Sequence, residues 1–335
     1  MKLWYIKSLM RMIKRILSQD FFFTFSFFPK KITTLNKTLN YEIKTKSKKN
    51  LNFAIVVQGP IILDQNFTFE TLKLYRKNFP DTNIILSTWP TTKKNIRILK
   101  KLKINVLENV EPNNKGISNI NLQIISSRNG IFLAKKMGAK FVLKTRTDQR
   151  AYHPNLKNYL FNFLYAFPLK KKYKSQKYRL VATSLNTFKY RLYGISDMFM
   201  FGHIEDVIKY FSPPLDNRIK LTNKLSNYSW STFSKLNICE VYFSTNFLKK
   251  IGRKINFTLA NSLKIYRDHF VILDYESIKL YWHKYTLNNN RYEHLGFSDP
   301  QLSFCDWLML YNLKNFIKYD ENMLKKKFQS RNKYY

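Results

Sequence analysis

Cysteine is scarce in this sequence of 335 residues, which contains only Cys239 and Cys305. The two lie far apart, with no Cys-x-x-Cys pair and no histidine at metal-ligand spacing. This pattern argues against a disulfide framework and against a structural zinc site. We therefore expect two buried free thiols in a reducing compartment.

Long apolar runs are also absent. No segment reaches the roughly 18 uncharged apolar residues of a membrane-spanning helix, so the sequence predicts none. Residues 1–18 instead interleave apolar and basic side chains, without the unbroken apolar stretch and small-residue cleavage site of a signal peptide. This spacing is typical of a basic amphipathic helix on a membrane surface, and equally of a helix packed on the domain.

Acidic residues and glycine are few: Asp and Glu number 21 against 59 Lys and Arg, and glycine numbers 8. The formal net charge is +38, and Lys, Asn, Ile, Phe and Tyr are all abundant. A coding bias toward A and T produces this composition without any functional pressure, so the charge alone does not indicate a nucleic-acid partner. It does favour phosphates, acidic glycans and anionic membrane leaflets in general.

The apolar residues that are present predict a large α/β domain. They make up 44% of the chain, which is enough for a sizeable core. Short apolar runs typical of buried parallel strands alternate with segments of helical period. We predict strands at 53–57, 83–87, 104–107, 141–143, 180–183, 198–201 and 270–273, and helices at 68–78 and 117–137.

This alternation predicts a doubly wound, mostly parallel sheet with helices on both faces and a helical C-terminal elaboration. We expect residues 1–50 to be a basic amphipathic segment and linker. Residues 51–320 form the α/β domain, and 321–335 form a basic tail. A lysine-rich stretch at 168–179 is interpreted as a solvated surface loop.

Two loops are placed for function by topology, because ligands of open α/β sheets bind beyond the carboxyl ends of the strands. Gln58-Gly59-Pro60 follows the first predicted strand, and residues 145–150 follow the fourth, reading Thr-Arg-Thr-Asp-Gln-Arg. The helix between them contains Ser127-Arg128-Asn129-Gly130.

These segments resemble the nucleotide-sugar domain of GT-A glycosyltransferases and, more narrowly, the WavE family of bacterial lipopolysaccharide-synthesis proteins. The resemblance covers about residues 50–290 and is most specific in two blocks, the Thr-Arg-Thr-Asp-Gln-Arg block and Ser-Asp-Met-Phe-Met-Phe-Gly at 196–202. Weaker stretches are 240–247 and Trp-His-Lys-Tyr at 282–285. The resemblance implies a GT-A-like fold and a sugar-nucleotide donor. It assigns donor binding to Gln58, Gly59, Arg128, Arg146, Asp148 and Gln149.

The sequence departs from the family pattern at Arg146. The GT-A site carries Asp-x-Asp, whose two carboxylates bind a divalent cation, whereas this chain has Arg146-Thr147-Asp148. Arg146 itself can neutralise a diphosphate by paired hydrogen bonds. Alternatively, Asp148 holds Mg²⁺ or Mn²⁺ with water as the other ligands. A third alternative is a structural ion pair between Arg146 and Asp148.

An inverting transferase also needs a general base near the acceptor hydroxyl. The candidates are Asp197, which precedes an apolar strand, and Glu240, about 90 residues after Asp148. The alternatives are a turn-capping role for Asp197 and, for Glu240, a buried carboxylate that caps a helix or pairs with a lysine. His203, His269 and His283 stand in no catalytic motif and are interpreted as ordinary residues.

The sequence thus predicts a nucleotide-sugar-dependent glycosyltransferase with a lipid-linked, lipopolysaccharide-core, lipooligosaccharide or capsule-type acceptor. We expect it in the cytoplasm, peripheral on the inner face of the inner membrane, with a possible divalent cation and no nucleic-acid partner. The rival hypotheses are a non-catalytic scaffold of the same fold and, less favoured, a basic nucleic-acid-binding protein that lacks any recognised motif.

Overall fold

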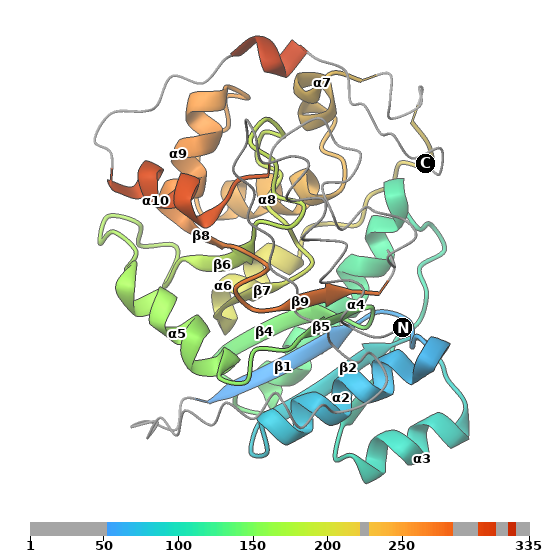
Figure 1. Ribbon diagram of the computed structural model, residues 1–335. Helices are drawn as coiled ribbons and strands as arrows, with labels where there is room; N and C mark the ends of the chain where they lie inside the picture. Colours follow the sequence, from blue (N-terminus) through green and yellow to red (C-terminus); the bar gives the residue numbers. More distant parts are fainter. Residues whose placement is uncertain (1–51, 222–227, 284–300, 313–320, 326–335) are drawn as a thin grey trace, which may run out of the picture. The chain divides into compact units, whose positions relative to one another are not determined.

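The structure is a computed structural model that describes residues 52–221, 228–283, 301–312 and 321–325 (Figure 1). The predicted amphipathic segment at 1–50 and residues 326–335 of the predicted basic tail lie outside these residues. In the described part, no helix is both long enough and apolar enough to cross a membrane.

The centre of the fold is a seven-stranded sheet in the order β3-β2-β1-β4-β7-β6-β8. All neighbouring pairs are parallel except those of β7, which runs antiparallel to both β4 and β6. The strands are β1 (Phe53–Gln58), β2 (Asn83–Thr88), β3 (Asn105–Glu108), β4 (Phe141–Arg146), β6 (Leu180–Thr183), β7 (Met200–His203) and β8 (Phe270–Leu273). The predicted mostly parallel α/β sheet is confirmed.

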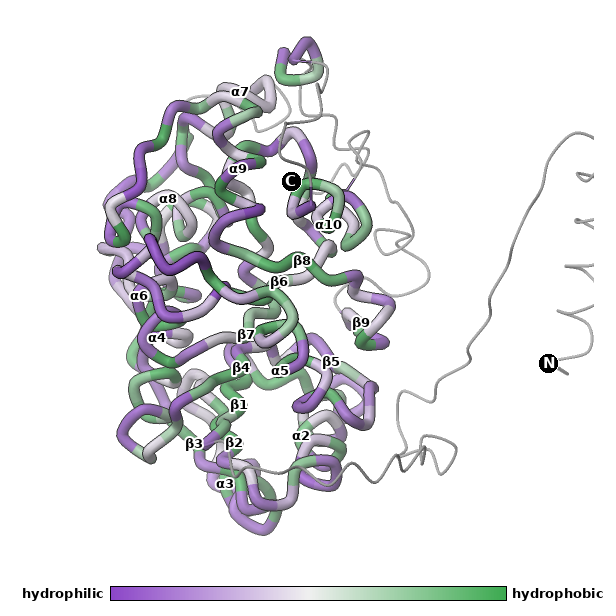
Figure 2. Tube along the Cα trace, turned by 90° about the vertical axis from the view of Figure 1, so that its left-hand side faces the viewer, coloured by the Kyte–Doolittle hydropathy of each residue, from purple (hydrophilic) through white to green (hydrophobic). Residues whose placement is uncertain are grey.

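Helices cover both faces of this sheet, as Figure 2 shows edge-on. One face carries α4 (Ile120–Lys136) and α6 (Ile204–Phe211), and the other carries α2 (Phe67–Asn78) and α5 (Leu156–Ala166). The remaining sheet helix, α3 (Lys93–Lys101), packs on β3. Because helices lie on both sides, β1 and β6 are buried along their whole length, which is why their sequences are continuous apolar runs.

The C-terminal part is helical, as predicted. It contains α7 (Trp230–Lys235), α8 (Glu240–Lys250), α9 (Leu259–His269), α10 (Phe304–Asn312) and the 3-10 turn at Glu321–Lys325. Here α9 leads directly into β8, and α10 packs on both of them.

Three features differ from the sequence prediction. Helices α3 and α5 were not anticipated. The strand predicted at 198–201 is displaced to β7, and its antiparallel direction was not visible in its apolar pattern. A second sheet pairs β5 (Gln149–Ala151) with β9 (Leu280–Trp282), which was also not anticipated. Both of its strands have three residues, too short for a periodic pattern.

Candidate functional site

The carboxyl ends of β1 and β4 lie side by side at one edge of the sheet. Gln58 and Arg146 are in register across these strands, with Ser87 of β2 on the other side of Gln58. Gly59 follows with a φ of +123°, and a Cβ atom there would lie 2.8 Å from the Thr147 hydroxyl oxygen. Glycine is therefore required both by the backbone conformation and by the close approach of the next strand.

Arg146 and Asp148 form a paired contact just beyond β4. The Arg146 Nε and Nη2 atoms each donate to one carboxylate oxygen of Asp148, at 2.8 Å. The indole N–H of Trp282 donates to the same carboxylate at 3.1 Å, and the backbone N–H of His283 donates to the Asp148 carbonyl. The Arg146 side chain is 25% exposed and that of Asp148 only 9%, so the guanidinium is the more accessible partner. The ion pair weighed as an alternative for these two residues is therefore present.

Several buried oxygen atoms near this edge have no partner among the described residues. They are Gln58 Oε1, Gln149 Oε1 and Ser196 Oγ. The Nε2 atom of Gln149 is directed to the sulfur of Met198, which fixes that side chain next to the segment before β7. An unpaired buried polar group costs about 1–3 kcal/mol. The site therefore offers acceptors to a ligand that carries hydroxyl or N–H groups.

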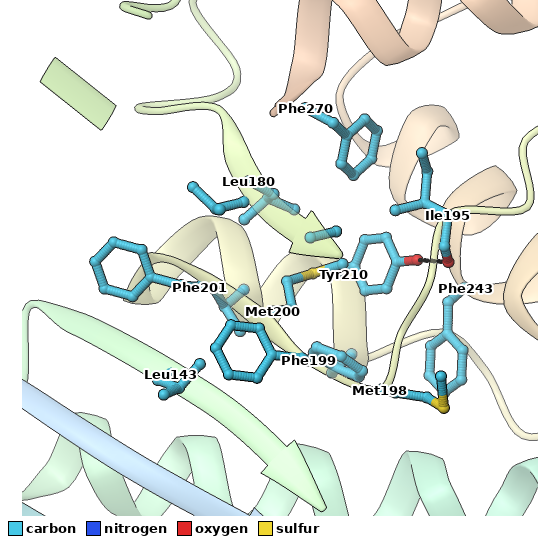
Figure 3. Close-up of a cluster of buried hydrophobic side chains, with 14 of the residues drawn as sticks. Leu143, Leu180, Ile195, Met198, Phe199, Met200, Phe201, Tyr210, Phe243 and Phe270 are labelled. Atoms are coloured by element: carbon cyan, nitrogen blue, oxygen red, sulfur yellow. Dashed lines mark hydrogen bonds between the residues drawn. The ribbon is translucent and has the colours of Figure 1, made fainter. Parts of the chain in front are cut away.

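Asp197 lies in the segment that leads into β7, and its residue is only 4% exposed. Within the described residues its carboxylate has no hydrogen-bond or ion-pair partner. Its backbone is fixed: its carbonyl accepts from the Lys144 ammonium at 2.7 Å. The Tyr210 hydroxyl donates to the carbonyl of Ile195, within the buried apolar cluster drawn in Figure 3. An unpaired carboxylate on an immobilised backbone suits a group that acts on a ligand.

Glu240 is bonded quite differently. Arg191 Nη1 donates to one carboxylate oxygen at 2.9 Å, and the Asn186 amide donates to the other. The Arg191 guanidinium is stacked among the aromatic rings of Phe188, Trp230 and Phe233. Glu240 is thus one half of a buried ion pair, as its structural interpretation anticipated, although the partner is an arginine.

The same two carboxylates belong to one buried region. Burial raises the pKa of Cys239 to about 12, with smaller contributions from the charges of Glu240 and Asp197. The pKa of Tyr210 is likewise raised by burial and then by the same two acids. The charges of Asp197 and Glu240 therefore act on the same two buried groups, Cys239 and Tyr210.

Arg128 is not brought to this edge. It lies on the middle of α4 and is half-buried. Its charge contributes to the lowered pKa of Lys250, after the larger effect of burial. The Lys250 ammonium in turn donates to the carbonyl of Lys209 on α6. The charge of Arg128 therefore acts on Lys250 of α8.

The acidic residues present do not form a cation site at Asp148. In the residues described, no group of three or more His, Cys, Asp and Glu side chains is arranged to hold a metal ion. The two oxygens of Asp148 already accept hydrogen bonds from Arg146 and Trp282. Arg146 also stands where the Asp-x-Asp pattern has its first carboxylate. A hard divalent cation prefers several oxygen ligands, which this donor set does not offer.

Two residues, Lys144 and His283, were not assigned to this region from the sequence. Lys144 directly follows the strand predicted at 141–143, and no local sequence pattern indicates that it is buried. His283 was interpreted as ordinary, yet its Nε2 atom lies 2.9 Å from an Asp64 oxygen and its ring stacks on Phe67. Only its position directly after Trp282, in a stretch of family resemblance, pointed to this edge.

No curated protein matches this chain. Distant likenesses exist among solved structures. A cytidylyltransferase from Leptospira borgpetersenii serovar Hardjo-bovis (strain JB197) is 12% identical, with a TM-score of 0.30, over 62% of this chain and 99% of that one. Glucosyl-3-phosphoglycerate synthase from Mycobacterium tuberculosis, in complex with Mn²⁺, UDP and phosphoglyceric acid, is 10% identical, with a TM-score of 0.32, over 62% and 81%. Overlaps this low carry no information on activity.

The family comparison covers most of the sequence. The model described as WavE lipopolysaccharide synthesis matches residues 53–334, which include both strand-end loops, Asp197 and Glu240. The chain therefore belongs to the WavE lipopolysaccharide synthesis family.

Proposed function

We propose that this protein is a glycosyltransferase that moves a sugar from a nucleotide-sugar donor to a lipopolysaccharide-type acceptor. The observation that carries the proposal is the arrangement at one sheet edge: the accessible Arg146 guanidinium, aligned by Asp148, and the unpaired carboxylate of Asp197. A cation for a leaving diphosphate and a base for an acceptor hydroxyl are the two groups that this reaction needs. Family membership supports the same assignment.

The donor site in this proposal consists of Gln58, Gly59, Arg146, Asp148 and Gln149. Arg146 contacts the diphosphate, and Asp148 orients the guanidinium rather than touching the ligand. The unpaired amide oxygens of Gln58 and Gln149 accept from donor hydroxyls or base N–H groups. Because Gly59 has no side chain, the ligand can approach the backbone closely. Arg128, which faces Lys250, is not part of this site.

The acceptor side is assigned to Asp197 rather than to Glu240. Both Glu240 oxygens are engaged by Arg191 and Asn186, so proton transfer there would break a buried ion pair. Asp197 has no such partner to lose. As general base, it takes the proton of the acceptor hydroxyl when the oxygen attacks the anomeric carbon, while the nucleotide leaves with the bonding electron pair.

The test is a binding and turnover panel on the full chain. Thermal shifts with UDP, GDP and CMP identify the nucleotide, and a sugar donor of that nucleotide is then assayed with lipooligosaccharide acceptors. Each assay is run with EDTA and with Mn²⁺, because the Arg146 arrangement favours a weak dependence on cation. Sugar transfer supports the proposal. Release of pyrophosphate from a nucleoside triphosphate and a sugar phosphate would assign a nucleotidyltransferase, and no nucleotide binding at all would indicate a scaffold.

The proposal also places the enzyme at the inner face of the inner membrane, where lipid-linked acceptors are exposed to cytoplasmic donors. Its support is in the sequence, in the basic and apolar alternation of residues 1–18.

A further inference from the structure

Lys144 is a lysine in the interior of the central sheet. Its relative exposure is 0%, and its neighbours in register are Val56 of β1 and Met200 of β7. The ammonium lies 4.8 Å from the centre of the Phe211 ring. Removing a charged amine from water is costly unless the charge is compensated, so a lysine at this position needs a reason beyond packing.

The hydrogen bonding of Lys144 gives only part of that compensation. Its ammonium donates to the backbone carbonyl of Asp197 and, among the residues described, pairs with no carboxylate within ion-pair distance. The side chain starts two residues before Arg146 and points to the same face of β4, so it lies beneath the guanidinium. Lys144 thus joins the floor of the donor site to the segment that carries Asp197.

Burial and three nearby charged residues affect the pKa of the Lys144 amine. Burial lowers the pKa of Lys144 to about 7, the charges of Asp197 and Asp148 raise it, and that of Arg146 lowers it. From α6, Tyr210 and Phe211 face the same space, and the pKa of Tyr210 is raised, so it stays neutral. Near neutral pH the amine is therefore divided between its two forms, and a nearby charge shifts the balance.

We propose that Lys144 is a positioning residue of the anion site: an anionic ligand bound at Arg146 draws a proton from solvent onto Lys144, whose charged form then holds the Asp197 carbonyl more firmly. The proposal rests on the donor site described above. It links donor binding to acceptor activation, since the same amine senses the diphosphate and fixes the carbonyl of Asp197. The ligand class is a nucleoside diphosphate ester, whose phosphates have no proton to exchange near neutral pH.

Titration calorimetry with UDP-glucose and with GDP-mannose tests this. At about pH 7.5, in two buffers of different ionisation enthalpy, the wild type takes up a fraction of one proton per ligand bound. Lys144→Met abolishes the uptake and weakens binding roughly 10-fold or more, the effect of losing one positive charge near the ligand. Lys136→Met removes an exposed lysine at the end of α4 and leaves both quantities unchanged.

Lys144→Gln separates the two parts of the role, and serves where Lys144→Met fails to fold. Glutamine keeps an N–H donor for the Asp197 carbonyl but cannot titrate. Proton uptake should therefore be lost in both variants. The kcat for sugar transfer should fall in both, and less in Lys144→Gln than in Lys144→Met. If the wild type binds the ligand and both variants bind it equally well with the same proton uptake, the role of Lys144 is refuted and the proposed function stands. If the wild type binds neither ligand, the proposed function fails, and this inference with it.

Discussion

At the scale of single residues, the two acids near the acceptor side differ in their bonding rather than in their burial. Asp197 and Glu240 are 4% and 7% exposed, respectively. Glu240 is held by Arg191 and Asn186, whereas the carboxylate of Asp197 has no partner among the described residues. Removing each charge should therefore affect a different property.

We expect Asp197→Asn to lower kcat by roughly 100-fold or more, the typical contribution of a general base. The melting temperature and the KM for the donor should change little. Glu240→Gln should instead destabilise the fold by about 3–5 kcal/mol, because it leaves Arg191 buried without its anion. Kinetics and urea unfolding of both variants check this, and a fully active Asp197→Asn enzyme would exclude Asp197 as the base.

Arg146 and Asp148 should show a different pattern, because in the proposed site Arg146 contacts the ligand and Asp148 aligns Arg146. Arg146→Lys keeps the charge but loses the paired geometry, so nucleotide binding should weaken by about 1.5–3 kcal/mol, the worth of a charged hydrogen bond. Asp148→Asn should lower both stability and transfer, since Arg146 loses its counter-ion. Calorimetry and melting curves separate these effects. A stable, inactive Asp148→Asn protein would mean that Asp148 itself touches the ligand or a cation.

The buried amine of Lys144 predicts a pH dependence of stability. The pKa is about 7 in the fold, against an ordinary value of 10.5, so between these values the unfolded chain binds the extra proton. The contribution of Lys144 to the free energy of unfolding of the wild type therefore rises as the pH increases from 7 toward 10.5. Lys144→Met lacks this dependence, so the melting temperature of the variant minus that of wild type should be larger at about pH 6 than at about pH 9. An equal difference at both pH values would contradict a buried titrating lysine.

At the scale of elements, the site depends on how closely β1 and β4 approach at their ends. Gly59 allows this approach, and Thr147 N–H donates to the Gln58 carbonyl just beyond the strands. The β5–β9 pair then brings Trp282 onto Asp148 across more than a hundred residues of chain. A change at the β1 turn should therefore disturb the position of Arg146.

Gly59→Ala tests this junction against a matched control. Both Gly59 and Gly138 have positive φ, +123° and +84°, but a Cβ at Gly138 meets nothing within 4 Å. Gly138→Ala should cost only conformational strain, about 1–2 kcal/mol. Gly59→Ala adds a clash with Thr147 and should also abolish nucleotide binding in a thermal-shift assay. Equal behaviour of the two variants would show that the junction does not shape the site.

At the scale of the whole molecule, the sequence carries a formal net charge of +38, with interleaved basic and apolar residues at 1–18. If this segment is a membrane anchor, deleting residues 1–40 should move the protein from the membrane fraction to the soluble fraction. Its melting temperature should stay the same, because the deletion leaves the described core residues, from Phe53 onward, intact. A truncated protein that still sediments with membranes would place the anchor elsewhere.

Much of the architecture was predictable because short stretches of sequence determine it. The apolar runs at 53–57 and 141–143 become β1 and β4 because strands buried on both faces need apolar side chains at every position. The loops after them could be selected as a ligand edge from topology alone. The antiparallel direction of β7 could not be predicted, since an apolar strand reads the same in either direction.

The sequence by itself determined the fold class, the family and the edge of the sheet where Gln58, Arg146 and Asp148 lie, because each depends on short-range patterns. Tertiary structure decided the partners: Asp148 with Arg146 and Trp282, Glu240 with Arg191, and Lys144 beneath Asp197. A side chain's partner is set by which distant strands and helices meet, and burial then fixes what leaving that side chain unpaired costs. For this reason Asp197 and Glu240, two equal candidates in the sequence, are bonded differently in the fold.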